Sequence, residues 1–306
     1  MTTRPERLLL LDSASLYFRA FFGVPDSLRA PDGTPVNAVR GLLDFIARLV
    51  TDRAPTRLVA CWDDDWRPAF RVAAIPSYKA HRVADEAANA EEVPDLLSPQ
   101  VPIIVDVLAA LGVARVGAPG HEADDVIGTL ATRAACPVDV VTGDRDLFQL
   151  VDDAREVRVL YTARGVGKHD VVDDADVRRR YGVPARAYAD FATLRGDPSD
   201  GLPGVAGVGE KTAATLLTTY GDLGGVLAVL DDPKSGLSPT LRRRLDAARD
   251  YLAVAPAVVR VVTDLDLPVV DDRLPRAPAD LEGLAELATR WNLGGSVQRV
   301  VAALAA

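Results

Sequence analysis

The chain has 306 residues, 48% of them hydrophobic and 26% charged, which allows a substantial core in one large domain or in a main domain with a smaller attachment. Its two cysteines, Cys61 and Cys136, exclude a disulfide framework and favour a reducing compartment. No apolar run is long enough for a signal peptide or a membrane span, so we expect a cytoplasmic protein with no membrane partner. A net charge of −9 argues at first against a nucleic-acid partner. Setting aside nine candidate site acids, however, leaves the acidic residues equal in number to the 35 lysines and arginines.

Strand and helix patterns alternate over the first half of the chain, which favours a mostly parallel sheet flanked by helices. The predicted strands are residues 8–12, 58–63, 113–116 and 138–142. The predicted helices are residues 37–50, 99–111 and 122–134. From about residue 173 onward the pattern is mostly helical, and a strongly basic helix is expected around Arg242–Arg249.

The segment 77–98 interrupts this alternation between a predicted strand and a predicted helix. It begins with a basic group, Lys79, His81 and Arg82, and continues as an acidic, alanine-rich stretch. Its position after a strand places it near the strand ends. The composition is also typical of a disordered surface insertion. The sequence therefore leaves open whether the segment belongs to a site at the strand ends or is a disordered insertion.

Acidic residues follow three of the apolar runs: LLLLD ends at Asp12, LVACWD at Asp63 and VDVVTGD at Asp144. The carboxyl ends of parallel strands meet at one edge of a sheet, where ligands bind. The pattern therefore predicts one acidic pocket, although each aspartate could instead cap a following helix. Two carboxylates ~4 Å apart repel by about 4 kcal/mol at an effective dielectric near 20. Such a pocket needs a cation, and oxygen ligands favour Mg²⁺ or Mn²⁺.

Further acids occur in short clusters that could aim at the same ions. Asp146 follows Asp144 by two residues, and Asp197 and Asp200 lie in the turn RGDPSDGLPG, where an ordinary turn-forming role is the alternative. No His or Cys accompanies them at zinc spacing, so a zinc site is disfavoured. The nine candidate metal ligands are Asp12, Asp63, Glu122, Asp124, Asp125, Asp144, Asp146, Asp197 and Asp200.

The glycine-rich segment GVAGVGEKTAATLL at 204–217 predicts a hairpin that leads into a helix beginning near Gly209. It is not a P-loop, because Glu210 separates the last glycine from Lys211, and it is not a dinucleotide fingerprint, because Thr212 occupies the third glycine position. Small residues and free N–H groups at a helix N-terminus suit a phosphate. We therefore expect a sequence-independent clamp for a DNA backbone, with a plain glycine-rich loop as the alternative.

In combination these motifs resemble the bacterial 5′–3′ exonucleases of the flap-endonuclease family, which include the N-terminal nuclease domain of DNA polymerase I. The resemblance runs from about Leu8 to at least Leu217, and the chain is similar to a stand-alone member because no polymerase segment follows. The segments that support it are LLLLDSASLYFRAFF, DGTPVNAVRGLL, IPSYKAHR, GHEADDVIGTLA, TGDRDLFQLV and RGDPSDGLPGVAGVGEKTAATLL.

The resemblance implies an α/β, PIN-like fold with a mixed, mostly parallel sheet flanked by helices. It implies a nuclease domain over 1–172, with a helical arch at about 77–101. It also implies a helical DNA-binding region over 173–306 that contains a helix–three-turn–helix motif at about 188–220.

The resemblance also implies roles for individual residues. Two or more Mg²⁺ or Mn²⁺ ions would be held by the nine acids, with Asp12, Asp63, Glu122, Asp124 and Asp144 nearer the first ion. Lys79 and Arg82 would act on the scissile phosphate. The DNA-binding residues would be Arg19, Tyr78, Gly207, Gly209, Lys211 and Thr212, and the carbonyls of Val205 and Val208 would hold a K⁺ ion.

The implied activity is hydrolysis of DNA at 5′ ends, flaps or nicks by a two-metal mechanism, in replication and repair, by a monomer that could also act on RNA–DNA hybrids. A junction-binding protein with little turnover and a PIN-type RNase are the alternatives. Two features depart from the family. Gly201 stands where asparagine is common, and the arch is long and acidic, which leaves open whether its acids face the DNA; these acids are Asp85, Glu86, Glu91, Glu92 and Asp95.

Overall fold

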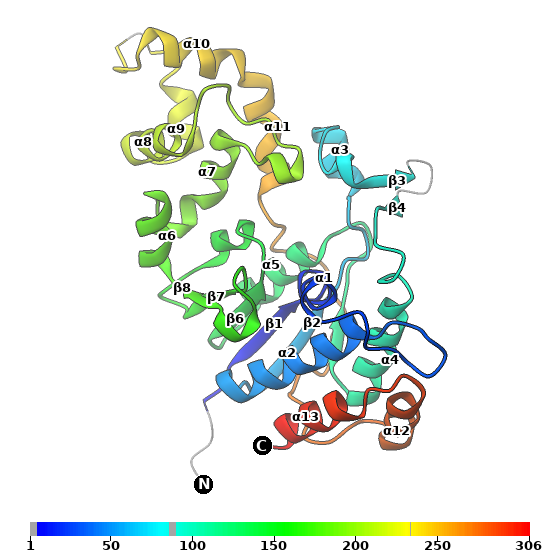
Figure 1. Ribbon diagram of the computed structural model, residues 1–306. Helices are drawn as coiled ribbons and strands as arrows, with labels where there is room; N and C mark the ends of the chain where they lie inside the picture. Colours follow the sequence, from blue (N-terminus) through cyan, green and yellow to red (C-terminus); the bar gives the residue numbers. More distant parts are fainter. Residues whose placement is uncertain (1–4, 86–89, 233) are drawn as a thin grey trace.

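A computed structural model describes residues 5–85, 90–232 and 234–306 (Figure 1). In this part of the chain six strands form one sheet in the order β5-β2-β1-β6-β7-β8. Their bounds are β1 Leu8–Asp12, β2 Arg57–Cys61, β5 Ala114–Val116, β6 Val138–Thr142, β7 Val157–Tyr161 and β8 Asp170–Val172. Neighbouring strands are parallel except β7 and β8, which are antiparallel. The prediction of a mixed, mostly parallel sheet is confirmed, and β7 and β8 are strands that the sequence patterns did not identify.

The run of four leucines in β1 reflects a sheet that is covered on both faces. Successive side chains of a strand point to opposite faces. Leu8 and Leu10 join a core with α5 (Ala123–Arg133), whereas Leu9 and Leu11 join a core with α2 (Asn37–Arg53). A strand that is buried on both faces has no polar side to alternate with, so its sequence is continuously apolar. The further helices of this part are α1 Ser13–Gly23 and α4 Gln100–Leu111.

The segment expected to form a helical arch is mostly not helical in its described residues. After α3 (Ala69–Ala74), the chain makes a 3₁₀ turn at Ala80–Arg82 and a two-stranded antiparallel ladder of β3 (Val83–Asp85) and β4 (Ala90–Glu91). Lys79 has a φ of 48° and the chain is extended from Val83, so no α-helix can run through this point. Residues 86–89, which include Glu86, lie outside the described residues.

A set of helices stands at one end of the molecule, beyond the sheet (Figure 1). They are α6 Asp174–Tyr181, α7 Tyr188–Arg195, α8 Glu210–Tyr220, α9 Leu223–Ala228, α10 Pro239–Ala247 and α11 Arg249–Val259. The expected basic helix around Arg242–Arg249 is therefore two helices that meet at Ala248, whose φ of −102° and ψ of 8° are not those of an α-helix.

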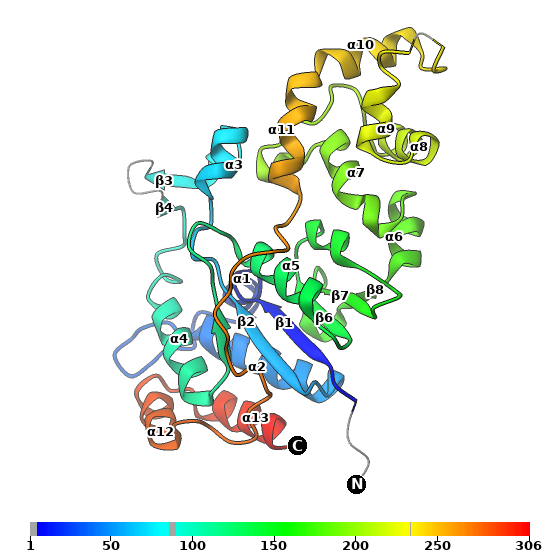
Figure 2. The same ribbon diagram turned by 180° about the vertical axis from the view of Figure 1, so that it is seen from behind.

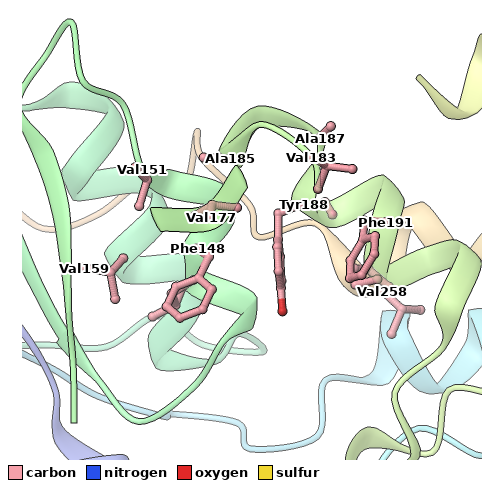
Figure 3. Packing of buried hydrophobic residues seen from close by; sticks show 14 of the residues in the cluster. Phe148, Val151, Val159, Val177, Val183, Ala185, Ala187, Tyr188, Phe191 and Val258 are labelled. Carbon is pink, nitrogen blue, oxygen red and sulfur yellow. The ribbon is translucent and has the colours of Figure 1, made fainter. Parts of the chain in front are cut away.

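Aromatic packing fixes these helices to the sheet (Figure 3). The ring of Phe148, in the turn after β6, meets the ring of Tyr188 on α7 edge to face, with 5.6 Å between centroids and 71° between planes. Tyr188 in turn packs against Phe191 at 5.8 Å. Burial of three aromatic rings is a large apolar contribution. The helical end is thus held rigidly beside the segment that contains Asp144 and Asp146.

The last two helices return to the other end of the molecule. Helices α12 (Leu281–Arg290) and α13 (Gly294–Ala305) lie beside α4 and α2, and their buried residues Leu284 and Val300 belong to the same core as Leu9 (Figures 1 and 2). The expected helical region over 173–306 is therefore divided by packing, with α6–α11 on one side of the sheet and α12–α13 on the other. Among the described residues no helix has the length and apolar character to cross a bilayer.

Candidate metal centre and nucleic-acid interface

A cavity of about 610 Å³ opens at the carboxyl edge of the sheet. Acids from separate strands and helices line it. The predicted ligands among them are Asp12, Asp63, Glu122, Asp124, Asp144 and Asp197. The parallel register explains the convergence, because Asp12 of β1 pairs with the last residue of β2, just before Asp63, and Asp144 follows β6 on the other side of β1. Residues almost two hundred positions apart therefore surround one space.

Burial and mutual repulsion disturb the ionisation of this first group of acids. Burial raises the pKa of Asp12 to about 6, although hydrogen bonds from the Thr142 hydroxyl (2.6 Å) and the Ser15 N–H (3.1 Å) lower it in part. Burial, followed by the charge of Asp12, raises the pKa of Asp63 to about 7. The same two causes raise the pKa of Asp124 well above its ordinary value. Lys79 compensates the charge of these carboxylates only in part, and a divalent cation would relieve the remaining repulsion.

A second group of acids lies beside Asp144. Burial and the charge of Asp144 raise the pKa of Asp146 well above its ordinary value. Burial raises the pKa of Asp200 to about 6, Lys79 opposes this and Asp144 adds to it. Asp197 is held by the Ser199 N–H (2.9 Å) and by Arg195 (3.2 Å). Asp144 thus lies between the acids of the sheet edge and those of residues 197–201, which we call the acidic turn.

Asp125 is placed differently from the other predicted ligands. It is fully buried, does not line the cavity, and accepts two hydrogen bonds from the buried Arg71 and one from the Val262 N–H at 2.8 Å. Arg71 also pairs with Glu122. Because its oxygens are engaged away from the cavity, we remove Asp125 from the candidate ligands and assign it to a buried ion-pair network behind the site.

Residues 77–82, which we call the arch base, project a cation into the cavity. Lys79 pairs with Glu122, and its side chain is 13% exposed. Burial alone would lower the pKa of Lys79, but the Glu122 carboxylate raises it well above its ordinary value, so the amine is charged. Tyr78 was predicted to contact DNA, but it is 4% exposed and its hydroxyl donates to Glu122 at 2.7 Å. That prediction is corrected, because Tyr78 faces the interior and orients Glu122.

The donor set fits a hard divalent cation, since the lining acids offer oxygen ligands alone and several are poorly compensated. Within the described residues, however, no three acidic, His or Cys side chains are already arranged around a single point. Some of the acids are instead turned toward protein cations: Lys79 and Arg71 share Glu122, and Arg82 pairs with Asp200. An ion would bind here by exchanging some of these protein partners.

Several cavity residues were not predicted from the sequence. Glu91 and Glu92 of the acidic arch line the cavity. Arg145, between the two acids of the TGDRD motif, and the aromatic Tyr161 also line it. The position of Arg145 inside the motif was an available signal. Tyr161 lies on β7, which the sequence patterns missed, and gave none.

The predicted DNA-backbone residues occupy the loop between α7 and α8 and the first turn of α8, in the helical end. Gly209 caps α8, and Lys211 on the first turn of that helix is exposed. Arg244 of α10 donates to the Gly207 carbonyl at 3.1 Å. Arg19 of α1 lines a second cavity, of about 840 Å³, that shares Ser15 with the first. The remaining predicted residues, Thr212, Val205 and Val208, lie in the same loop or on the first turn of α8.

Comparison with known proteins gives two matching family profiles. The profile "5′-3′ exonuclease, N-terminal resolvase-like domain" matches residues 7–182, and "5′-3′ exonuclease, C-terminal SAM fold" matches residues 183–282. A 5′-3′ exonuclease of Streptomyces coelicolor is 65% identical over 97% of this chain and the whole of that protein. A 5′-3′ exonuclease of Mycobacterium tuberculosis is 55% identical over 97% of both chains. A DNA polymerase I of Mycobacterium bovis is 40% identical over 87% of this chain and 31% of the polymerase.

Solved structures with the same fold are more distant in sequence. The bacteriophage T5 5′-exonuclease with bound zinc ions has 16% identity and a TM-score of 0.67, covering 96% of this chain and all of that chain. Flap endonuclease-1 of Methanococcus jannaschii has 15% identity and a TM-score of 0.59, covering 98% of this chain and 93% of that chain. Taken with the length and identity of the sequence matches, these findings establish that the chain belongs to the 5′-3′ exonuclease family of enzymes.

Proposed function

We propose that the protein is a metal-dependent 5′–3′ exonuclease and 5′-flap endonuclease that hydrolyses DNA phosphodiesters at 5′ ends, flaps or nicks during replication and repair. The observation that supports this most strongly is the shared cavity lined by six of the predicted ligands, which come from distant segments. The ligands we propose for two or more Mg²⁺ or Mn²⁺ ions are Asp12, Asp63, Glu122, Asp124, Asp144, Asp146, Asp197 and Asp200. Structural relatives support a metal role, since the T5 flap endonuclease was crystallised with DNA and metal ions.

Bound divalent ions would supply charge stabilisation for the attacking and leaving oxygens of the phosphodiester. The chain itself supplies cations that line the same cavity as the acids. Lys79 is charged and held at the cavity wall by Glu122, and Arg82 follows it at the rim. Both are preorganised to stabilise negative charge that develops on the phosphate. Hydrolysis would add water across the P–O3′ bond and leave a 5′-phosphate and a 3′-hydroxyl.

We propose that residues 1–172 form the nuclease domain and that the helical region from residue 173 binds duplex DNA. Exposed Lys211 and the free N–H groups at the start of α8 suit a backbone phosphate, which any sequence offers. A K⁺ ion at the carbonyls of Val205 and Val208 would strengthen this clamp. We expect a monomer, with specificity set by the shape of the DNA rather than by its bases.

The test is the substitution Asp144→Asn, because Asp144 lies between the two groups of acids. Cleavage of a 5′-flap DNA with Mn²⁺ should fall by more than about 100-fold, as expected when a group that holds a metal ion is lost. Binding of the same DNA without metal should persist. The surface substitution Asp52→Asn, on an exposed pair with Arg48, is the control and should leave cleavage unchanged.

Three results would contradict the proposal. Cleavage by Asp144→Asn at the wild-type rate would remove the metal assignment. Binding without any EDTA-sensitive cleavage by the wild type would favour a junction-binding protein. Preference for single-stranded RNA over flap DNA would favour a PIN-type RNase.

A further inference from the structure

The arch base (residues 77–82) and the acidic turn (residues 197–201) are joined by a set of direct contacts, although more than a hundred residues separate them. The Ser77 hydroxyl donates to the Gly201 carbonyl at 2.7 Å, and the Lys79 N–H donates to the Asp200 carbonyl at 3.0 Å. Arg82 donates to the Ser199 carbonyl and to the Asp200 carboxylate, both at 3.0 Å. The two segments therefore form one unit at the rim of the cavity.

Gly201 makes this close approach possible. Its φ is +72°, a conformation that glycine adopts without strain. A Cβ at this position would lie 2.1 Å from the Ser77 carbonyl oxygen and 3.0 Å from the Ser77 carbonyl carbon. Both are backbone atoms of the arch base, so no flexible side chain can move aside. With the backbone of this chain, a residue other than glycine must shift the arch base or the acidic turn to remove this overlap.

The displaced backbone would take Lys79 with it. Lys79 has a φ of 48°, and its N–H is held by Asp200 in the same contact. From this position its amine pairs with Glu122. Left-handed conformations of side-chain-bearing residues persist only where the surroundings fix them. The contact with the acidic turn fixes the Lys79 backbone directly, while Arg67 holds the neighbouring Pro76 and Tyr78 carbonyls.

We infer that Gly201 is a positioning residue that holds Lys79 in the cavity before DNA binds. It lets the Ser77 carbonyl approach closely, and this approach keeps the Lys79 N–H on the Asp200 carbonyl. This inference rests on the proposed nuclease function for its kinetic consequence. Its structural consequence, the placement of Lys79, is measurable without DNA or metal. The substitution Gly201→Ala adds the smallest Cβ, and Gly201→Asn adds the same Cβ on a residue that tolerates positive φ. Agreement between these two variants separates steric displacement from backbone strain.

The first measurement is the rate at which an amine-reactive reagent labels Lys79 in the metal-free protein, followed by mass spectrometry. Lys79 is nearly enclosed, whereas Lys211 is exposed and serves as the internal reference. Both Gly201 variants should increase the labelling of Lys79 relative to Lys211 at least fivefold. The matched controls are Gly236→Ala and Gly236→Asn, because Gly236 has a φ of +76° with nothing within 4 Å of its Cβ position. They should leave the labelling ratio unchanged.

The second measurement is a double-mutant cycle on 5′-flap cleavage with Mn²⁺. Gly201→Ala should lower kcat about tenfold with little change in KM, and it should have no further effect in a Lys79→Ala background, because the two residues act as a unit. Ser77→Ala, which removes a hydrogen bond without adding bulk, should lower kcat two- to fivefold.

Unchanged Lys79 labelling in folded Gly201 variants would overturn the inference. An undiminished effect of Gly201→Ala in the Lys79→Ala background would do the same. An inactive wild type with increased labelling in the Gly201 variants would refute the proposed nuclease function and support the positional role.

Discussion

At the scale of single residues, the acids of the candidate site differ in how far the protein compensates their charge. Asp63 and Asp124 have raised pKa values because burial and neighbouring charges oppose their ionisation. Glu122, by contrast, is contacted by Lys79, Tyr78 and Arg71. This difference indicates that Glu122 is held in place by the protein, whereas the charges of Asp63 and Asp124 are only partly compensated by Lys79.

Arg71 is the residue whose loss should disturb this arrangement most. Its side chain is 3% exposed and pairs with both Glu122 and Asp125. Arg71→Ala leaves the buried Asp125 without its cation and Glu122 with Lys79 alone, so the free energy of unfolding should fall by about 3–5 kcal/mol. Urea denaturation measures this loss. The comparison is Arg48→Ala, which breaks an exposed pair with Asp52 and should change stability by no more than about 0.5 kcal/mol. Equal effects of the two substitutions would contradict the buried network.

At the scale of secondary-structure elements, the hairpin between α7 and α8 depends on α10. The guanidinium of Arg244 packs against Gly207. A Cβ at Gly207 would be 2.6 Å from the Arg244 Cζ. Gly207 also has a φ of +74°. The positive φ favours glycine here, whereas the Arg244 guanidinium is the end of a flexible side chain that can shift to admit a Cβ.

We expect Arg244→Ala to weaken the binding of duplex DNA about tenfold, because the Gly207 carbonyl loses its donor and the surface loses a cation. Measuring Kd over a range of salt concentrations distinguishes the two causes. If Arg244 itself contacts a phosphate, the slope of log K against log salt should decrease by about 1. If it only supports the hairpin, the slope should not change. Arg249→Ala, whose guanidinium is paired with Asp231 and Asp246, is the control. Wild-type affinity in Arg244→Ala would exclude both roles.

At the scale of the whole molecule, gathering buried acids around the cavity lowers the stability of the folded protein. Asp12 and Asp63 are brought together from two strands, and their pKa values rise from 3.8 to about 6 and about 7. The folded protein therefore binds these protons more tightly than the unfolded chain does. The packing of Phe148, Tyr188 and Phe191 and the two cores on either side of the sheet stabilise the fold against this repulsion.

The pH dependence of stability follows from these directions. Between about pH 4 and pH 7 unfolding releases protons, so the free energy of unfolding of the metal-free protein should decrease as pH rises through this window. Mn²⁺ should raise the Tm more at pH 8 than at pH 5.5, because the ion binds deprotonated carboxylates. Calorimetry at several pH values measures both effects. Asp63→Asn should make the metal-free profile flatter, and an equal Mn²⁺ effect at both pH values would contradict a carboxylate site.

The sequence alone identified most of the elements that position the site. Uninterrupted apolar runs predicted β1, β2 and β6 because strands buried on both faces have no polar side, and the acids that follow those runs predicted the acidic cavity. Strand β7 and the short β8 were missed. The arch was expected to be helical, but its described residues form a turn and a strand pair, with Lys79 held at positive φ by a contact with a distant turn.

Only the tertiary structure decided which acids face the cavity. Asp124 and Asp125 are adjacent on the first turn of α5, and about 100° of helical rotation separates their directions. One side chain lines the cavity, whereas the other pairs with Arg71 behind it. Composition and spacing predict an acidic cluster, because they show which acids directly follow the apolar strands along the chain. The partner of each carboxylate depends on which segments pack beside it, and that is fixed only when α3, α5 and the acidic turn are assembled around the sheet.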